Sequence, residues 1–563
     1  MTTPQKGSEL IADLMANYGV THVFFVPTIL NNTLYEMEKR TGIARLVTHS
    51  EKAAAYMADG YARASGRVGV CMAQMIGAGN LASGLRDGAM ASTPMIAITG
   101  GPYDFSRGRF QYQEMDDTPA FAPYTKDQLY VSRLDRVAPT FRQAFRIATS
   151  GQPGPVHVQL EGHWGEVVEA QQGVVDAFAE DQFSRAPAFR PSPEVHTVAA
   201  AAKLLAHAER PVIVAGGGVG RSDARAELVA LAEALAIPVA SSLSGKDVIP
   251  AGHPLNAGVA GLYSRQSAND IVSRADLVFF IGTKAGSQQT FNWQVPAPGT
   301  TVIQADIDGA ITGLNYPTAA SLVGDAKATL LALSAELDGV DRTDRSAWLA
   351  ETAKITADWY SSQHEFRSAD ANPMRPERLC ADLSDVLPDD AIVVVDTGHS
   401  GVWGASHIDL RSPEQRFLRA AGSLGWGLPG AIGAQCAVPD RPVVCFTGDG
   451  GIWYHLSELE TAARWNVPVT VVVNNNAAFN QEIPLWKAAY QGELTGNHAE
   501  MWRFRPTNFA RIAAEMGVQS VRVEDPSELS GALKESIATD GPSLVEVVTD
   551  VWATAPKPNK PPA

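Results

Sequence analysis

One stretch, residues 443–476, constrains the fold of this chain more than any other. It begins with an apolar run, Val443 to Phe446, of the kind that forms a buried strand. A glycine-rich turn follows at Thr447 to Gly451, and residues 452–463 then carry apolar side chains at helical spacing. A second apolar run, Val469 to Val473, completes the unit. The pattern predicts a buried strand, one amphipathic helix and a second buried strand.

Oxygen-bearing side chains follow both predicted strands. Asp449 comes after the first strand, and the amides of Asn474 to Asn476 end the second. Ligands of parallel sheets bind beyond the carboxyl ends of the strands, and oxygen ligands of this kind suit Mg²⁺. The glycines around Asp449 allow backbone N–H groups and a helix N-terminus to approach a diphosphate. We therefore predict a magnesium and diphosphate site that includes Gly448, Gly450 and Gly451.

The spacing of these residues resembles a known motif. Asp449, in a Gly-Asp-Gly turn, and Asn476 lie 27 positions apart (476 − 449). This looks like the thiamine diphosphate (ThDP) motif of the acetolactate synthase and pyruvate decarboxylase superfamily. The resemblance implies that Mg²⁺ is bound by Asp449, Asn476 and the backbone carbonyl of Ala478, and that this ion anchors the diphosphate of ThDP.

The composition is that of a globular protein with several domains. The chain has 563 residues, 45% hydrophobic and 19% charged, which is enough for roughly three or four domains. A net charge of −16 gives no electrostatic reason to expect nucleic acid or an anionic membrane as a partner. Four cysteines lack CxxC spacing, and the N-terminus has no apolar signal segment. We expect a cytoplasmic protein with reduced thiols.

Helical and strand patterns alternate along the chain and predict an α/β fold. The resemblance implies three Rossmann-like domains with parallel sheets: a pyrimidine-binding, a central and a diphosphate-binding domain. Their expected bounds are 1–177, 194–339 and 374–555, with a flexible tail at 556–563. The runs expected to form strands lie within 22–26, 68–72 and 95–99, with a fourth entered through the turn Gln152 to Val156, then 209–215, 237–242, 274–281 and 301–307, and finally 391–395, 443–446, 469–473 and 543–548.

The segment from Glu51 to Arg63 resembles the activating-glutamate helix of ThDP enzymes. It matches the pattern E-x-x-A-A-x-x-A-D-G-Y-A-R, and Ser50 is suited to cap the helix. Taken alone, Glu51 would be explained as a carboxylate that complements the helix dipole. The resemblance implies a catalytic role instead. A glutamate in an apolar place hydrogen-bonds the aminopyrimidine ring of ThDP and thereby promotes deprotonation of the thiazolium carbon.

Further segments resemble family elements that contact the cofactor. Gly77 and Asn80 belong to a turn that opens a helix. Gln113 matches the glutamine of an F-Q-E-x-D element, which implies a catalytic side chain facing the cofactor, and an exposed loop residue is the alternative. Two more elements are expected to contact the diphosphate and the aminopyrimidine, respectively. They are Thr397-Gly398-His399 and Gly422-Ser423-Leu424, with Leu424 as the apolar wedge that bends the cofactor.

Other positions depart from the family and bear on the substrate. Where many relatives have F-G-x-P-G-G, this chain has Phe24 to Ile29, so larger residues stand beside the expected active site. Asn480 occupies a position that is commonly glycine. The residues predicted to line the substrate pocket are Phe25, Thr28, Ile29, Asn480 and Gln481. His455, on the helix predicted after Asp449, is expected to lie on the surface.

Two glycine-bearing segments bear on a second cofactor. The run from Gly216 to Gly218 does not form GxGxxG, which favours a tight turn over a dinucleotide site. The segment Gly282 to Gly286 lacks the Arg and Asp contacts of flavin-binding relatives. FAD is therefore possible but not supported.

The resemblance covers nearly the whole chain and implies an enzyme. The leading hypothesis is ThDP- and magnesium-dependent cleavage and/or formation of a C–C bond next to a carbonyl, as in acetolactate synthase-like decarboxylation of a 2-keto acid with carboligation. Two alternatives stay open: cleavage of a 2-hydroxyacyl-CoA, oxalyl-CoA or cyclic diketone, and a non-catalytic regulatory subunit. The resemblance also implies a small-molecule carbonyl substrate and a homodimer or homotetramer with shared active sites.

Overall fold

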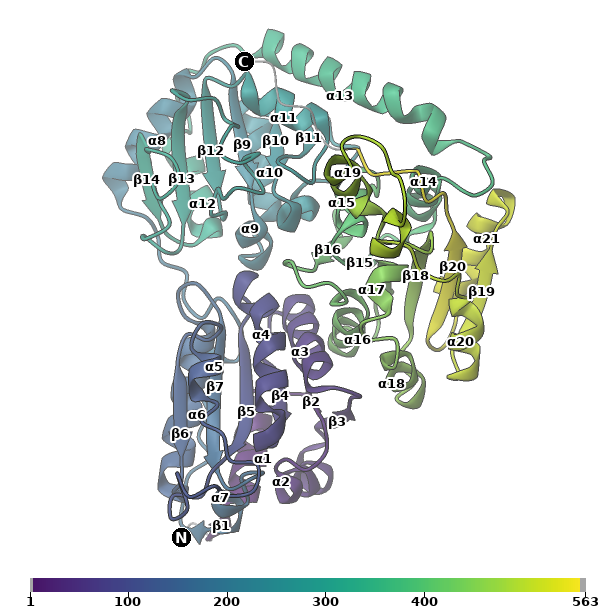
Figure 1. Cartoon of the computed structure of the whole chain (residues 1–563). Coiled ribbons are helices and arrows are strands. Elements are labelled where there is room, and N and C mark those ends of the chain that lie inside the picture. Colours follow the sequence, from purple (N-terminus) through teal and green to yellow (C-terminus); the bar gives the residue numbers. More distant parts are fainter. Residues whose placement is uncertain (1–3, 557–563) are drawn as a thin grey trace.

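The computed structural model describes residues 4–556 and contains three parallel six-stranded sheets that follow one another along the chain (Figure 1). Each sheet is combined with helices, which confirms the predicted α/β fold class of three parallel-sheet units. Of the predicted tail, residues 557–563 lie outside the described residues.

The N-terminal sheet has the strand order β3-β2-β4-β5-β7-β6. Its strands are β2 (His22–Phe25), β3 (Ala44–Val47), β4 (Gly69–Ala73), β5 (Met95–Gly101), β6 (Gln128–Val131) and β7 (Pro155–Glu161). The principal helices are α1 (Gly7–Asn17), α2 (Asn31–Glu36), α3 (Glu51–Ser65), α4 (Ala78–Met90), α6 (Leu134–Thr149) and α7 (Glu166–Ala170). A short antiparallel pair, β1 (Gln5–Lys6) and β8 (Gln172–Gly173), joins the two ends of this unit.

The central sheet has the order β11-β10-β9-β12-β13-β14. Its strands are β9 (Pro211–Ala215), β10 (Val239–Ser241), β11 (Asn256–Val259), β12 (Leu277–Ile281), β13 (Thr301–Asp306) and β14 (Ala320–Val323). Its helices include α8 (Val195–His207), α9 (Gly217–Arg221), α10 (Arg225–Leu235), α11 (Gln266–Ser273) and α12 (Ala326–Glu336). A long helix, α13 (Ser346–Arg367), then leads to the third unit.

The C-terminal sheet has the order β16-β15-β17-β18-β20-β19. Its strands are β15 (Ile392–Val395), β16 (Arg416–Arg419), β17 (Val443–Gly448), β18 (Val469–Asn475), β19 (Gln519–Val523) and β20 (Ser543–Val548). Its helices include α14 (Pro376–Val386), α15 (His399–Ser406), α16 (Gly427–Ala437), α19 (Ile483–Ala489), α20 (Phe509–Glu515) and α21 (Pro526–Ile537).

The segment between β17 and β18 differs from the prediction of one helix. It forms two short helices, α17 (Asp449–Ile452) and α18 (Glu458–Arg464), joined by a turn. His455 lies in this turn and is only 7% exposed, so its predicted surface position is wrong. Its ring packs edge-on against Tyr56 of α3, with 5.5 Å between the ring centroids. The chain leaves its helical path here, and the turn places the imidazole against the N-terminal unit.

Helices α3 and α16 join the N-terminal and C-terminal units at close range. A side chain at Gly60 would place its Cβ 1.9 Å from the carbonyl oxygen of Gly430, and one at Gly433 would lie 1.8 Å from that of Met57. Glycine is therefore required at this crossing, because the two backbones are in direct contact. The small-residue composition of both helices is explained by this packing.

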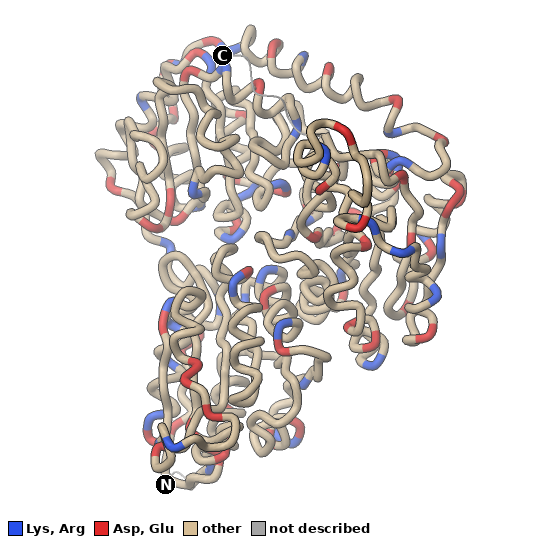
Figure 2. Tube along the Cα trace, in the orientation of Figure 1, with Lys and Arg blue, Asp and Glu red and all other residues tan. Residues whose placement is uncertain are grey.

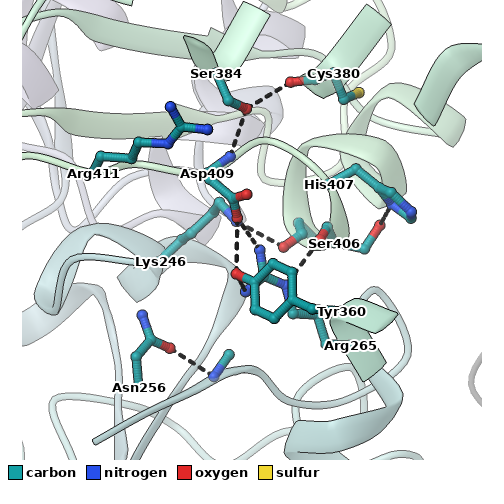
Figure 3. A network of polar contacts seen from close by, with 12 residues as sticks. Lys246, Asn256, Arg265, Tyr360, Cys380, Ser384, Ser406, His407, Asp409 and Arg411 are labelled. Carbon is teal, nitrogen blue, oxygen red and sulfur yellow. Dashed lines mark hydrogen bonds and ion pairs between the residues drawn. The ribbon is translucent and has the colours of Figure 1, made fainter. Parts of the chain in front are cut away.

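A buried polar network joins the central and C-terminal units (Figure 3). Arg265 donates hydrogen bonds to the carboxylate of Asp409 and to the hydroxyl of Tyr360. The ammonium of Lys246 donates to the carbonyl of Ala405 at 2.8 Å. Because buried charges need partners, these contacts fix the two units against each other.

Acidic and basic residues are interspersed over all three units (Figure 2), so the net charge of −16 is spread over the molecule. Among the helices within residues 4–556, none combines the length and the apolar character that crossing a membrane requires.

Candidate active site

Asp449 lies at the carboxyl end of β17, where the strand passes into α17. It is 3% exposed and accepts hydrogen bonds from the backbone N–H groups of Gly450 at 2.8 Å and of Ala478 at 2.9 Å. Burial raises the pKa of Asp449 to about 7, against the lowering effect of these donors. A buried carboxylate bound only by neutral N–H groups is well suited to receive a cation.

The three asparagines at the end of β18 have different partners. Asn474 accepts a hydrogen bond from the hydroxyl of Thr549, and Asn475 donates to Glu546 and to the carbonyl of Thr507. Asn476 is 9% exposed, and its Oδ1 atom is buried without a hydrogen-bond partner among the described residues. An unpaired buried oxygen is costly, so Asn476 is the amide that fits a metal ion.

The surroundings of Asp449 fit a bound diphosphate and metal. A side chain at Gly450 would place its Cβ 2.4 Å from the Phe479 ring, and one at Gly451 would lie 2.8 Å from the Asp396 carboxylate. These glycines let the start of α17 approach its neighbours closely. No cluster of three His, Cys, Asp or Glu side chains in residues 4–556 could hold a metal. A metal at this edge would therefore use the mixed set of carboxylate, amide and carbonyl oxygens predicted for Asp449, Asn476 and Ala478.

Glu51 begins α3, and Ser50 caps the helix by accepting a hydrogen bond from the N–H of Ala53 at 3.1 Å. The Glu51 carboxylate is half-buried and accepts a hydrogen bond from Asn80 at 3.2 Å. A side chain at Gly77 would place its Cβ 2.5 Å from the same carboxylate. The structure thus brings together the three cofactor residues predicted on the N-terminal unit.

The loop that leads into α16 is held by two buried aspartates. Asp87 on α4 accepts hydrogen bonds from the N–H groups of Ala421 at 2.8 Å and Ser423 at 3.0 Å. Asp396, at the end of β15, accepts from Gly425 at 3.0 Å and Gly427 at 3.2 Å. Every second N–H from 421 to 427 is therefore bound. Gly422 is exposed and Leu424 half-buried, so neither belongs to the core.

Neither aspartate was among the predicted site residues. Asp396 directly follows the apolar strand β15, and that position could have indicated it. Asp87 has no such signal, because a single carboxylate in a helix is ordinarily solvated. Burial raises the pKa of Asp396 to about 6, and four donors oppose this shift.

The turn after β15 carries the predicted diphosphate residues Thr397, Gly398 and His399. Gly398 adopts φ +68°, a backbone conformation that favours glycine, and His399 is the first residue of α15. The N–H of Thr397 donates to its neighbour Asp396 at 2.7 Å. The turn therefore continues the same carboxyl edge as Asp449.

Asn480 and Gln481 lie against this turn. Asn480 is 4% exposed and donates both amide hydrogens to the carbonyls of Val551 and Ala553, at 3.3 Å each. Its oxygen, 2.7 Å from Nδ1 of His399, therefore accepts a hydrogen bond, so Nδ1 carries the proton. Gln481 donates to the hydroxyl of Tyr263 at 3.1 Å.

The other predicted substrate residues follow β2. Phe25 and Ile29 are buried in the core of the N-terminal unit, whereas Thr28 is exposed. Thr28 and Leu30 adopt φ +73° and +45°, so the chain keeps a glycine-like backbone with larger residues. A threonine there is strained.

Gln113 lies in a loop that follows β5. Its φ is +64°, its side chain is half-buried, and the nearby Phe110 is 99% exposed. The loop starts at the carboxyl edge of the N-terminal sheet, the edge from which Glu51 is reached. The catalytic role of Gln113 stays a prediction.

Within a single chain, the half of the site around Glu51 and the half around Asp449 lie at different places in the structure. Glu51 contacts Asn80 in the first turn of α4, whereas Ala91, just beyond the last turn, accepts a hydrogen bond from Arg221 of the central unit. The edge that carries Gln481 contacts the central unit. Figure 1 agrees: α2 and α7 mark the lower end of the N-terminal sheet, and α15 and α19 lie near the central unit.

In the central unit, Gly216 follows β9, and Gly217 and Gly218 begin the short helix α9, so this run opens a helix where the sequence favoured a tight turn. A side chain at Gly216 would place its Cβ 2.2 Å from the carbonyl oxygen of Gly282, and one at Gly218 would lie 2.7 Å from the Gly282 Cα. The glycines therefore allow close contact between the start of α9 and Gly282, which follows β12. This arrangement gives FAD no further support.

Comparison with known protein families gives three matches in chain order. Residues 5–120 match the N-terminal TPP binding domain of thiamine pyrophosphate enzymes, 198–333 the central domain, and 396–547 the C-terminal TPP binding domain. Thiamine pyrophosphate is another name for ThDP. Each match overlaps one of the three sheets, although β6 and β7 lie beyond the first match and β15 precedes the third.

Curated relatives extend over nearly the whole chain. A probable acetolactate synthase large subunit of Methanocaldococcus jannaschii is 33% identical over 558 residues, covering 97% of this chain and 92% of the relative. A second, from Methanococcus aeolicus, is 32% identical over 97% of this chain and 92% of the relative. The isozyme 2 large subunit of acetolactate synthase from Escherichia coli is 29% identical over 98% and 97% of the two chains.

Three parallel α/β units, which match the three domains of thiamine pyrophosphate enzymes in order, define the class of ThDP-dependent enzymes. The chain belongs to the thiamine pyrophosphate enzyme family, and within it to the decarboxylases and carboligases.

Proposed function

We propose that this protein is an acetolactate synthase-like enzyme that, with ThDP and Mg²⁺, decarboxylates a 2-keto acid and joins the remaining fragment to a second carbonyl. The named relatives, at about 30% identity over almost the full chain, support this substrate class. The observation that carries the proposal is the placement of Asp449 and Asn476, a buried carboxylate and an unpaired buried amide oxygen, directly after the adjacent strands β17 and β18.

Magnesium is part of the proposal. Asp449, Asn476 and the carbonyl of Ala478 would bind the ion, and Gly448, Gly450 and Gly451 would admit the diphosphate to the start of α17. Oxygen ligands of this kind suit Mg²⁺, which usually keeps further positions for phosphate oxygens. The diphosphate would also meet the turn of Thr397, Gly398 and His399.

The remaining cofactor residues have proposed roles in orientation and proton transfer. When bound, ThDP supplies a thiazolium that stabilises the negative charge left by decarboxylation. Gly422, Ser423 and Leu424 would orient its aminopyrimidine. Glu51 would hold and move a proton at the ring nitrogen, with Asn80 and Gly77 fixing its carboxylate.

The separation of the two halves supports a homodimer or homotetramer with shared sites. The Glu51 contact at Asn80 and the loop contact at Asp87 are seven residues apart on α4 (87 − 80), or about 10 Å along the helix. The carboxyl edges of the two sheets diverge further (Figure 1). In this proposal, Glu51 of one subunit serves the cofactor held by Asp449 of another.

Exposed apolar residues on both halves support the same arrangement. On the N-terminal edge they are Ile76, Phe110, Tyr112 and Met115, and on the C-terminal unit they are Trp453, Tyr454 and Leu485. Contact between copies would cover them and give Glu51 the apolar place expected from the sequence.

We propose a cytoplasmic location and the domain bounds 1–177, 194–339 and 374–555. The four cysteines are free thiols, as a reducing compartment allows. The alternative substrates, a 2-hydroxyacyl-CoA, oxalyl-CoA or a cyclic diketone, find support in the strained Thr28, where many relatives have glycine.

Carbon dioxide release from a panel of 2-keto acids, starting with pyruvate, tests the reaction in the presence of ThDP and Mg²⁺. We expect release that is lost in Glu51→Gln. If ThDP binds without release from any 2-keto acid, the alternative substrates replace the proposal. If ThDP does not bind, the cofactor assignment fails.

Mixing two inactive variants tests the shared site. Glu51→Gln and Asp449→Ala chains, unfolded and refolded together, form mixed dimers with one intact site each. Random pairing should restore about a quarter of the wild-type activity. A site built within one chain would stay inactive in the mixture.

A further inference from the structure

The cofactor loop of the C-terminal unit receives part of its support from the N-terminal unit. Asp87 lies on α4, is fully buried, and binds the N–H of Ala421 with Oδ1 and the N–H of Ser423 with Oδ2. A carboxylate that uses both oxygens on alternate N–H groups fixes the direction of the backbone between them. The residue between these two donors is Gly422, which is exposed.

A second carboxylate, that of Asp59, shares the arginine partner of Asp87 but lacks its contacts with the loop backbone. Arg63 of α3 donates a hydrogen bond to Asp87 at 2.8 Å and also pairs with Asp59. Asp59 is as deeply buried as Asp87, but it accepts from the indole N–H of Trp426 and not from the loop backbone at 421 or 423. The two aspartates therefore share the cation and differ in what they hold.

The rest of the loop is held by Asp396 of its own unit and by Arg63 of the N-terminal unit. Asp396 binds Gly425 and Gly427, and Arg63 also donates to the carbonyl of Arg419 at 2.6 Å. Without Asp87, the N–H groups of Ala421 and Ser423 would lose the carboxylate that binds them. The segment that depends on Asp87 is therefore Ala421 to Ser423.

We propose that Asp87 is a positioning residue for cofactor binding, acting from the N-terminal unit on the loop from Ala421 to Leu424. This role of Asp87 rests on the proposed function in one respect, namely that the loop contacts the aminopyrimidine of ThDP. Asp87 does not itself touch the cofactor. Its effect should therefore fall on the pyrimidine end and spare the diphosphate end, which is held at Asp449 on a different strand.

The test compares two ligands and two matched variants by titration calorimetry. The ligands are ThDP with Mg²⁺, and inorganic pyrophosphate with Mg²⁺, which lacks the pyrimidine. Asp87→Asn keeps the size of the side chain but offers an N–H₂ group to an N–H donor, so we expect ThDP to bind roughly 10-fold more weakly or worse. Pyrophosphate affinity should change less than threefold. Asp59→Asn, which disturbs the same Arg63, should change neither affinity by more than threefold.

Hydrogen exchange of the ligand-free protein gives a readout independent of binding. The amides of Ala421 and Ser423 should exchange faster in Asp87→Asn, whereas those of Gly425 and Gly427, held by Asp396, should keep their rates. If Asp87→Asn does not fold, Ala421→Pro deletes one donor, leaves the ion pair with Arg63 intact, and should show the same selective loss of ThDP.

The outcomes separate this proposal from the function on which it rests. Equal weakening of ThDP and pyrophosphate, unchanged ThDP binding in Asp87→Asn, or equal losses in Asp59→Asn would each overturn the positioning role and leave the cofactor assignment standing. Wild-type protein that binds pyrophosphate but not ThDP would overturn both.

Discussion

The side-chain oxygen of Asn480 lies 2.7 Å from Nδ1 of His399. Because both amide hydrogens of Asn480 are bound by backbone carbonyls, its oxygen accepts in this contact, and Nδ1 of His399 carries a proton. Family members commonly have glycine at the position of Asn480. In this chain, Asn480 therefore holds a proton on Nδ1 of His399, a residue of the proposed diphosphate turn.

Asn480→Gly should remove the acceptor of the Nδ1 proton of His399. Nitrogen NMR of the labelled protein is expected to show hydrogen-bonded Nδ1–H for His399 in the wild type and a shifted Nδ1 signal in the variant, with His399→Gln used to assign the signals. Loss of the buried hydrogen bonds should also lower the free energy of unfolding by about 1 to 3 kcal/mol. Wild-type protein with the His399 proton on Nε2 would contradict the orientation of the amide.

Thr28→Gly should stabilise the protein and change its substrate preference. Thr28 holds φ +73°, which costs a β-branched residue about 1 to 2 kcal/mol, partly offset by the greater unfolded-state entropy of glycine. We expect a net gain of about 0.5 to 1 kcal/mol in urea unfolding. Ratios of kcat/KM over a panel of 2-keto acids should also change.

Thr28→Ala is the matched control for that prediction. It removes the exposed side chain but keeps a Cβ at positive φ, so it should alter the kcat/KM ratios without the full stability gain. If both variants keep the wild-type ratios, Thr28 does not select the substrate.

The strands predicted from the sequence are the four inner strands of each sheet, and the two edge strands of each sheet were missed. Inner strands such as β4 and β12 are buried along their whole length and appear as continuous apolar runs. Edge strands such as β6 and β19 are partly exposed, with polar residues interleaved. Continuous apolar runs indicate strands that are covered on both faces, and these short edge strands offer neither such a run nor a strict alternation of apolar and polar residues.

The residues of the candidate site likewise divide into those that local sequence predicts and those that it does not. Residues on a strand end or helix start, such as Asp449 and Glu51, could be placed from local pattern. Asp87 could not, because its importance comes from contacts with a loop more than 330 positions away (421 − 87 = 334). The separation of Glu51 from Asp449 within one chain likewise follows from the packing of whole units, which local sequence does not record.

His455 should make the protein sensitive to acid. Burial lowers its pKa to about 4, so the folded state keeps it neutral while the unfolded state gains a proton below pH 6.5. Stability from this residue is therefore lost as the pH falls from about 6.5 toward 4. Between pH 7 and pH 5 the loss should be about 2 kcal/mol.

His455→Phe keeps the edge-on contact with Tyr56 and removes the titration. Its urea unfolding should depend less on pH than that of the wild type by this amount. His196→Gln, on a side chain that is 77% exposed, should leave the wild-type pH dependence unchanged. Equal acid sensitivity in His455→Phe and wild type would show that another group is responsible.

Two adjacent asparagines should separate stability from metal binding. In ligand-free protein, Oδ1 of Asn476 is buried without a partner, so Asn476→Ala removes a desolvated oxygen at little cost, within about 1 kcal/mol. Asn475 donates to Glu546 and Thr507 and accepts from the N–H of Ala477, so Asn475→Ala should cost about 2 to 4 kcal/mol.

Binding should show the reverse order. Asn476→Ala removes a proposed ligand and should weaken Mg²⁺-dependent ThDP binding by at least about 10- to 100-fold, whereas Asn475→Ala should bind nearly normally once folded. Urea unfolding of the ligand-free variants and calorimetric titration with ThDP and Mg²⁺ measure the two effects separately. Stable Asn476→Ala protein that still binds ThDP with wild-type affinity would contradict the assignment of Asn476 as a metal ligand.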